Sequence, residues 1–186
     1  MKLIFLDIDG VLNVIGQGHD EYGQIFHQHF MDNLKRIIDE TGAKIVVSSS
    51  WRKSGLKVMQ DMWKHRGLAG EVIDVTPSLY LEKGGCIQFW NDKLQERPTP
   101  KIRGYSIPRG CEIEYWLNNE NGKYEIESYV ILDDDTDMLM SQKEKFVQCS
   151  GNIDEEDCVD AGWGLTKNCT DKAISILNRA VGKINT

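Results

Sequence analysis

Long apolar runs are missing from this chain of 186 residues. No stretch approaches the roughly 20 consecutive apolar residues that a membrane-spanning helix needs. The first apolar segment, residues 3–6, is short and is soon followed by Asp7 and Asp9, which is not typical of a secretory signal. We therefore expect a cytoplasmic protein with no membrane partner.

Cysteine is also sparse, and its spacing forms no recognised pattern. The five cysteines are Cys86, Cys111, Cys149, Cys158 and Cys169. Their odd number and the lack of a C-x-x-C pair indicate neither a zinc site nor a disulfide framework. We expect them to be reduced thiols.

An excess of positive charge is missing as well. The formal net charge is −7, from 29 acidic and 22 basic residues. This balance argues against a broad basic face for duplex nucleic acid, so any nucleic-acid substrate would be held at an end. The pattern G-x-x-x-x-G-K-[ST] is absent too, which excludes a P-loop nucleotide triphosphatase.

What the chain does contain is an alternation of β-branched runs and amphipathic stretches. Strands are predicted at residues 3–6, 43–47, 71–75, 128–132 and 145–147. Helices are predicted at residues 30–40, 56–65, 111–118 and 172–181. This order predicts one α/β domain over residues 1–186, a three-layer doubly wound parallel sheet. A small flap at 14–29 and an insertion at 78–104, with one helix near 87–94, interrupt the alternation.

The first strand ends in two carboxylates. Asp7 and Asp9 are separated only by Ile8, so in an extended chain they lie on one side of the backbone. Like charges this close at the end of a buried strand need a cation or a shared proton. The alternative is a solvated surface turn, because Asp-Gly is a common turn dipeptide.

Small hydroxyl groups follow the second strand, in the tract S-S-S-W-R that begins at residue 48. Side chains at the carboxyl end of a parallel strand face the crevice in which open α/β sheets bind ligands. We therefore predict that Ser48, Ser49 or Ser50, together with Arg52, contacts a phosphate group. The alternative is an ordinary helix start, for which Ser54 alone would supply the cap.

The fourth strand runs straight into an acidic series, Asp133, Asp134, Asp135 and Asp137. These acids meet Asp7 and Asp9 at one edge of the sheet if the first strand lies between the second and the fourth. Such an all-oxygen set suits Mg²⁺ better than Zn²⁺, and no calcium-loop pattern is present. The H-x-H pair at His27 and His29 is a weaker metal signal, more typical of a solvated loop.

These groups together predict phosphoryl transfer. Mg²⁺, a serine hydroxyl and the cation of Arg109 would neutralise the charge that develops on the phosphate. Asp7, which is nearer the strand, would attack phosphorus and form an aspartyl-phosphate. Asp9 would protonate the leaving oxygen and later deprotonate the attacking water.

The stretch D-I-D-G-V-L-N at residues 7–13 resembles the D-x-D-G-x-[TL] signature of the haloacid dehalogenase (HAD) superfamily. Three further motifs of that family follow in order: Ser49, with Ser48 and Ser50 as alternatives; Arg109; and Asp133 with Asp134, to which Asp137 is a weaker addition. The resemblance implies an aspartyl-phosphate mechanism and a Mg²⁺ requirement.

The same resemblance implies how the metal and the phosphate are held. Metal ligands would come from the Asp7 side chain, the Asp9 backbone carbonyl and a carboxylate of Asp133 or Asp134. Gly10 of the first motif would lie in the phosphate-binding loop.

A narrower resemblance concerns the substrate. The segments S-S-S-W-R, V-I-D-V-T-P and V-I-L-D-D-D are similar to the small HAD domains associated with bacterial and phage RNA-repair proteins. The S-x-R spacing at Ser50 and Arg52 is similar to the phosphatase half of polynucleotide kinase-phosphatases. The implied substrate is a phosphate on a nucleotide, an oligonucleotide end or a small molecule.

The chain departs from the family in two ways, because Arg109 replaces the usual lysine and no independently folded cap is evident. A capless or minimally capped site favours a large or polymeric substrate.

Two other functions fit parts of the pattern. A phospho-receiver signalling domain would use an acceptor aspartate at the third strand, where Asp74 stands, but it leaves the serine tract unexplained. A catalytically silent phosphate- or metal-binding module would keep the same fold. The sequence predicts no oligomeric state.

Overall fold

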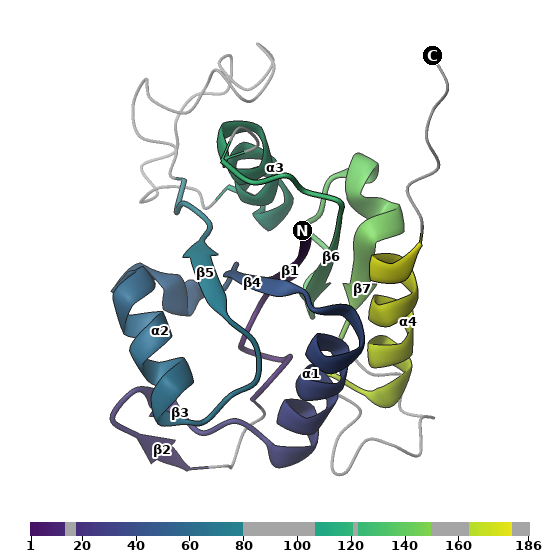
Figure 1. Ribbon diagram of the computed structural model, residues 1–186. Helices are drawn as coiled ribbons and strands as arrows, with labels where there is room; N and C mark the ends of the chain where they lie inside the picture. Colours follow the sequence, from purple (N-terminus) through teal and green to yellow (C-terminus); the bar gives the residue numbers. More distant parts are fainter. Residues whose placement is uncertain (14–17, 80–106, 121–122, 150–163, 180–186) are drawn as a thin grey trace, which may run out of the picture.

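The computed structural model describes residues 1–13, 18–79, 107–120, 123–149 and 164–179 (Figure 1). Its main sheet contains five parallel strands, β1 (Lys2–Leu6), β4 (Lys44–Val47), β5 (Val72–Val75), β6 (Ser128–Asp133) and β7 (Phe146–Gln148). Their spatial order is β5-β4-β1-β6-β7, so the predicted parallel α/β sheet is confirmed. The first strand lies between the second and the fourth of this sheet, as assembly of the predicted site requires.

Helices cover both faces of the sheet. One face carries α1 (Gln28–Thr41), α2 (Leu56–His65) and α4 (Lys167–Asn178), and the other carries α3 (Arg109–Glu120) (Figure 1). Because side chains alternate along a strand, Ile4 and Leu6 join the core with α1, α2 and α4, whereas Leu3 and Phe5 pack with α3. The continuous apolar run of β1 is therefore explained by burial on both faces.

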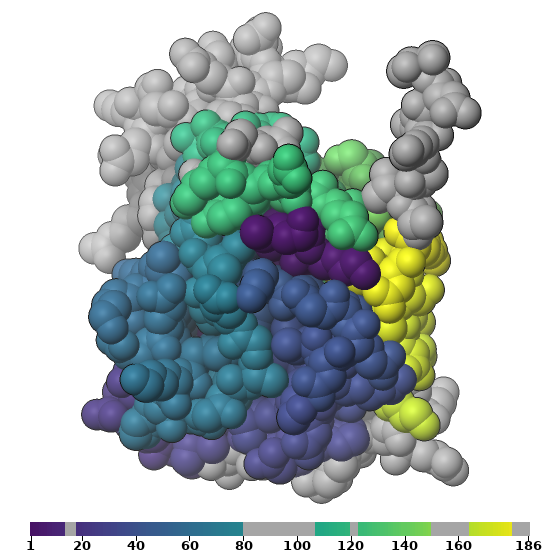
Figure 2. All heavy atoms as spheres, viewed as in Figure 1, coloured from purple at the N-terminus to yellow at the C-terminus, as the bar shows by residue number. Residues whose placement is uncertain are grey.

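The start of β1 reaches the surface at the edge opposite to the carboxyl ends of the strands. Figure 2 shows these N-terminal residues in purple, between the green segment around α3 and the blue segment of α1 and β4. Met1 is exposed, and its amino group donates a hydrogen bond to the Glu125 carbonyl. Groups at the carboxyl ends of the strands therefore lie away from this start.

Three helices begin earlier than their apolar spacing predicts: α3 begins at Arg109 rather than residue 111, and polar side chains cap the starts of α1 and α4. α1 begins after His27, whose Nδ1 accepts a hydrogen bond from the N–H of His29 at 3.3 Å. α4 begins at residue 167 rather than 172, because the Thr166 hydroxyl accepts from the N–H of Cys169 at 3.2 Å. The structure thus gives the half-buried His27 a capping role at the start of α1.

The alternative in which Ser54 caps α2 is wrong. A 3₁₀ helix, η1 (Ser50–Ser54), follows β4, and α2 starts after Gly55 without a side-chain cap. The capping serine is Ser49, which accepts a hydrogen bond from the N–H of Trp51 at 3.4 Å and caps η1 instead. This extra turn keeps the serine tract at the carboxyl end of β4.

The described part of the flap forms an antiparallel hairpin, β2 (His19–Asp20) and β3 (Gly23–Gln24). Arg66, directly after α2, holds this hairpin by donating from Nε and Nη2 to the two oxygens of Asp20, at 2.8 and 2.7 Å. The guanidinium of Arg66 also lies 4.3 Å from the centre of the Phe26 ring. The flap is therefore fixed against the end of α2.

Several predicted features lie outside the described residues. These are the insertion from residue 80 onward with its helix near 87–94, residues 14–17 of the flap, and Cys86 and Cys158. Of the cysteines that are described, Cys111, Cys149 and Cys169 are free thiols. Within the described ranges, no helix has the length and apolar character needed to cross a membrane.

Candidate active site

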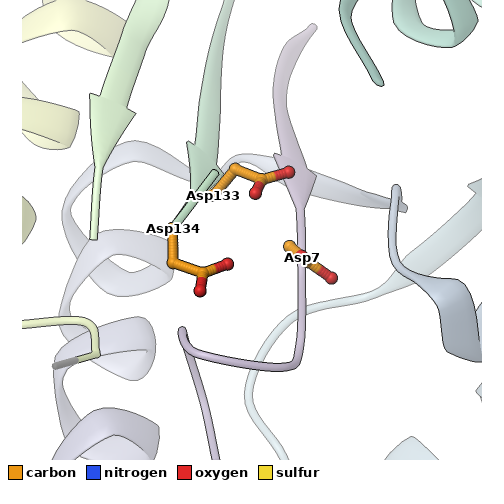
Figure 3. A group of neighbouring side chains, drawn as sticks. All are labelled: Asp7, Asp133 and Asp134. Atoms are coloured by element: carbon orange, nitrogen blue, oxygen red, sulfur yellow. The ribbon is translucent and has the colours of Figure 1, made fainter. Parts of the chain in front are cut away.

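Three carboxylates converge at the ends of the two central strands. Asp7 follows β1, Asp133 is the last residue of β6, and Asp134 comes next. Each offers an oxygen atom, and these three atoms lie within 4.8 Å of one another. Asp133 and Asp134 both extend toward the strand end that carries Asp7 (Figure 3). The parallel pairing of β1 with β6 causes this meeting, and the N–H of Asp7 continues it by donating to the Leu132 carbonyl at 2.9 Å.

The protein leaves this group of acids without a full set of partners. Asp133 is 1% exposed, and its Oδ1 accepts a hydrogen bond from the N–H of Asp135 at 3.0 Å. Its Oδ2 is buried and has no hydrogen-bond partner among the described residues, and the nearest cation is Arg109, whose Nε lies 3.7 Å away. Burial, followed by the charge of Asp7, raises the pKa of Asp133 to about 8. Burial also raises the pKa of Asp7 and of Asp134. A hard divalent cation with oxygen ligands fits this orphaned donor set.

Asp7 is nevertheless held in one orientation. Its Oδ1 accepts from the N–H of Ile8 at 2.7 Å, and a hydrogen bond from the Ser49 side chain opposes the effect of burial on its pKa. The positive charge of Arg109 acts in the same direction. Of the three serines considered, the fully buried Ser49 is therefore the one that contacts Asp7.

Asp9 is directed elsewhere, although only Ile8 separates it from Asp7. Its carboxylate accepts hydrogen bonds from the indole N–H of Trp51 at 2.9 and 3.0 Å and from the Ser50 hydroxyl at 3.2 Å. Asn13 Nδ2 donates to it at 2.8 Å. The side chain of Asp9 is exposed and lies outside the group formed by Asp7, Asp133 and Asp134.

Gly10 allows the acidic loops to approach each other. Its φ is +72°, a conformation that side-chain-bearing residues rarely adopt. A Cβ atom placed there would lie 2.3 Å from Oδ2 of Asp134. The described structure therefore shows close packing of Gly10 against an acidic side chain, while its predicted contact with phosphate stays a prediction.

The two arginines occupy different positions. Arg109 begins α3 and lies between Asp133 and Glu112, with nitrogen–oxygen distances of 3.7 and 3.8 Å. Arg52 is buried behind it, where it forms an ion pair with Glu112 and donates from Nη1 to the Ser49 carbonyl at 2.7 Å. These contacts engage donors of Arg52, so its predicted contact with phosphate stays a prediction.

Three partners in this region were not predicted from the sequence. Glu112 pairs with Arg52, and its Oε1 also accepts from the N–H of Leu79 at 2.9 Å. Trp51 and Asn13 hold the Asp9 carboxylate. The one signal for Glu112 is its position three residues after Arg109, which places both side chains on the same face of a helix.

Ser48 and Asp137, which were also predicted for the site, have other partners. The Ser48 hydroxyl is 3.5 Å from that of Thr76. Asp137 accepts from the N–H of Arg109 at 2.8 Å and thereby caps α3, apart from the three-acid group.

The sheet order excludes the receiver-domain alternative. When the five strands of the main sheet are numbered by their order in the chain, they lie side by side in the order 3-2-1-4-5. Flavodoxin-like receivers have the spatial order 2-1-3-4-5. Asp74, the acid that a receiver would use, lies on the edge strand β5 and accepts from the indole N–H of Trp116 at 3.0 Å. It is therefore a structural residue.

A parallel sheet of this order, with an acidic group at the ends of its two central strands, defines an α/β domain of HAD type. The chain belongs to the family described as the HAD domain in Swiss Army Knife RNA repair proteins, whose model matches residues 3–157. No curated protein and no solved structure matched the chain. The predicted resemblance is thus confirmed, and the matched range contains all the site residues named above.

Proposed function

We propose that this domain is a Mg²⁺-dependent phosphatase that acts on phosphomonoesters at nucleotides or polynucleotide ends. The observation that carries the proposal is the three-acid group of Asp7, Asp133 and Asp134, in which one buried oxygen of Asp133 has no hydrogen-bond partner among the described residues. Such a group is unfavourable in the protein alone and becomes favourable around a cation.

The three carboxylates would hold the ion, together with the backbone carbonyl of Asp9. When bound, Mg²⁺ supplies positive charge against the phosphoryl oxygens. Asp7 supplies the nucleophile: its carboxylate oxygen attacks phosphorus, the bond from phosphorus to the leaving oxygen breaks, and an aspartyl-phosphate results. Ser49 and Arg109, which both act on the Asp7 carboxylate, would hold phosphoryl oxygens beside it.

Asp9 supplies the proton. Its carboxylate lies apart from the three-acid group and is held by Trp51 and Ser50, so the two neighbouring aspartates have separate positions. Asp9 would protonate the leaving oxygen and then take a proton from the water that hydrolyses the aspartyl-phosphate.

The substrate class rests on the family and on charge. The family is described by its occurrence in RNA repair proteins. A net charge of −7 disfavours binding along a duplex, whereas a single terminal phosphate needs only the local cations and the metal.

The first test is hydrolysis of p-nitrophenyl phosphate with Mg²⁺. We expect turnover that EDTA removes, and a loss of at least roughly a thousandfold in Asp7→Asn. Asp135→Asn, a neighbouring exposed acid outside the three-acid group, is the matched control and should retain activity. Acid-quenched samples of the active protein should contain a phosphorylated chain, and those of Asp7→Asn should not.

A folded chain that Mg²⁺ stabilises but that hydrolyses no phosphomonoester would overturn this proposal in favour of a silent binding module. The substrate is tested separately, by comparing oligonucleotides that carry a 3′- or 5′-phosphate with sugar phosphates. A strong preference for sugar phosphates would exclude the polynucleotide-end assignment.

A further inference from the structure

A cavity of about 330 Å³ lies between the flap hairpin and the segment η1–α2. Residues that line it include Tyr22, Ser50, Trp51, Ser54, Val58 and Met59. Ligand cavities commonly span roughly 300–1,000 Å³, so this one accommodates a single ring system rather than a folded polymer.

The cavity shares two side chains with the surroundings of Asp9. Ser50 and Trp51 line it, and the same two side chains donate hydrogen bonds to the Asp9 carboxylate at 3.2 and 2.9 Å. Asp9 is the group proposed to protonate the leaving oxygen. The part of a substrate beyond that oxygen would therefore enter this cavity.

The rings at the cavity are held in place before any ligand binds. The indole N–H of Trp51 is fixed by Asp9, and the guanidinium of Arg66 lies 5.5 Å from the centre of its ring. A Cβ atom on Gly23 would lie 3.0 Å from the Trp51 ring, so the flap also packs closely on it. Tyr22 adds a second ring from the flap. A fixed aromatic surface favours stacking of a flat ring, because little side-chain freedom is lost.

The charge of the lining selects against a second phosphate. No lysine or arginine is among the described residues that line the cavity, and the charged residue there is Glu21. A carboxylate repels phosphate and accepts hydrogen bonds from amino groups. A neutral aromatic ring with exocyclic amino groups fits these properties.

The geometry points to a nucleobase subsite: the base of the nucleotide that bears the phosphate stacks against Trp51 and Tyr22 while the phosphate lies at Asp7. This assignment rests on the proposed phosphatase function and adds that substrates with a base, especially adenine, guanine or cytosine, are preferred over base-free sugar phosphates.

The test compares kcat/KM for nucleoside monophosphates, phosphorylated at either the 3′ or the 5′ position, with kcat/KM for ribose 5-phosphate. The native chain should prefer one nucleotide series by roughly tenfold or more, as expected for one stacked base. Val58→Trp fills the cavity from α2 and should reduce that ratio toward one. Lys57→Trp adds the same bulk at the neighbouring, 80% exposed position and should keep the ratio.

A separate binding measurement distinguishes failure of the subsite from failure of the enzyme proposal. Adenosine, which has no phosphate, should bind the native chain in ligand-observed NMR and should not bind Val58→Trp. Adenosine binding that is lost in Val58→Trp supports the subsite even if no phosphomonoester is hydrolysed. Equal kcat/KM with and without a base, or adenosine binding unchanged in Val58→Trp, would overturn it.

Discussion

Two carboxylates, Asp20 in the flap and Asp133 at the end of β6, show how differently this protein treats negative charge. Asp20, in the flap, has both oxygens bonded by Arg66, and one of them also accepts from the N–H of Tyr22 at 2.8 Å. These contacts lower the pKa of Asp20 to about 2. Asp133, at the end of β6, keeps one oxygen without a hydrogen-bond partner among the described residues, and its pKa is raised to about 8.

The difference indicates which of the two carboxylates has partners for both oxygens within the protein. Asp20 has its cation within the chain and serves to anchor the flap. Burial alone does not set Asp133 apart, because Glu112 is also buried and yet pairs with Arg52. Asp133 differs in that its cation, Arg109, lies 3.7 Å away and its Oδ2 has no hydrogen-bond partner among the described residues, so an external cation would complete its contacts.

The largest effect should come from breaking the buried ion pair between Arg52 and Glu112. Arg52 and Glu112 are both buried, so Glu112→Gln leaves the Arg52 charge without its counterion and should lower the free energy of unfolding by about 3 kcal/mol. Urea denaturation at pH 7 measures this loss.

The double variant Arg52→Met with Glu112→Met is the control, because it removes both charges and keeps similar volume. It should be much closer to the native chain than Glu112→Gln is. If the single and double variants lose the same stability, the ion pair is not what Glu112 contributes.

The second prediction concerns Gly10, which packs closely against Asp134 of the three-acid group. Gly10→Ala should cost about 2 kcal/mol, because alanine is disfavoured at a φ of +72° and its Cβ would displace the Asp134 carboxylate. It should also weaken stabilisation by Mg²⁺ in thermal unfolding. Gly42→Ala is the matched control, since Gly42 has a φ of +66° with nothing within 4 Å of an added Cβ. If both variants respond to Mg²⁺ as the native chain does, Gly10 does not position a metal ligand.

A third, smaller effect is expected at the ion pair between Asp20 of the flap and Arg66. Asp20→Asn should cost about 1 kcal/mol at pH 7, a value reduced by solvent because the carboxylate is partly exposed. Since the pKa of Asp20 is lowered in the folded state, its contribution is present above about pH 4 and is lost as the pH falls toward 2. Denaturation at several pH values should therefore show the native and variant curves converging in acid. A difference that stays constant down to pH 3 would contradict the assigned ion pair.

The three-acid group was predictable because each acid has a local signal in the sequence and the fold brings the acids together. An apolar run followed directly by Asp7, and another followed by Asp133, places each acid at a strand end. The order of parallel strands then brings them together, as the structure shows. Apolar spacing and one topological rule were sufficient for this part.

The pairing of individual side chains was not predictable in the same way. Trp51 reaches Asp9 across 42 positions of sequence, and Arg52 reaches Glu112 across 60. Both contacts depend on the 3₁₀ turn η1, which changes the direction of the two side chains and has no distinct apolar period. The start of α2 at Leu56 was predicted, but its cap was not, because η1 stands between the serine tract and the helix.

The last prediction concerns the sign of the effect at Asp133. In metal-free protein at pH 8, Asp133→Asn should raise the free energy of unfolding by about 0.5 kcal/mol, because the amide keeps the acceptor for the Asp135 N–H and removes a charge facing Asp7. The change in the free energy of unfolding would thus be smaller in Asp133→Asn than in Asp20→Asn, and opposite in sign.

The pH dependence gives the same comparison a second readout. Because the pKa of Asp133 is raised in the folded state, its contribution to metal-free stability is present below about pH 4 and is lost as the pH rises through about 8. Mg²⁺ should restore stability at pH 8 in the native chain and have little effect in Asp133→Asn, as followed by thermal unfolding with and without EDTA. If Asp133→Asn destabilised the metal-free protein as Asp20→Asn does, the unpaired oxygen would be satisfied within the chain, and the need for an external cation would disappear.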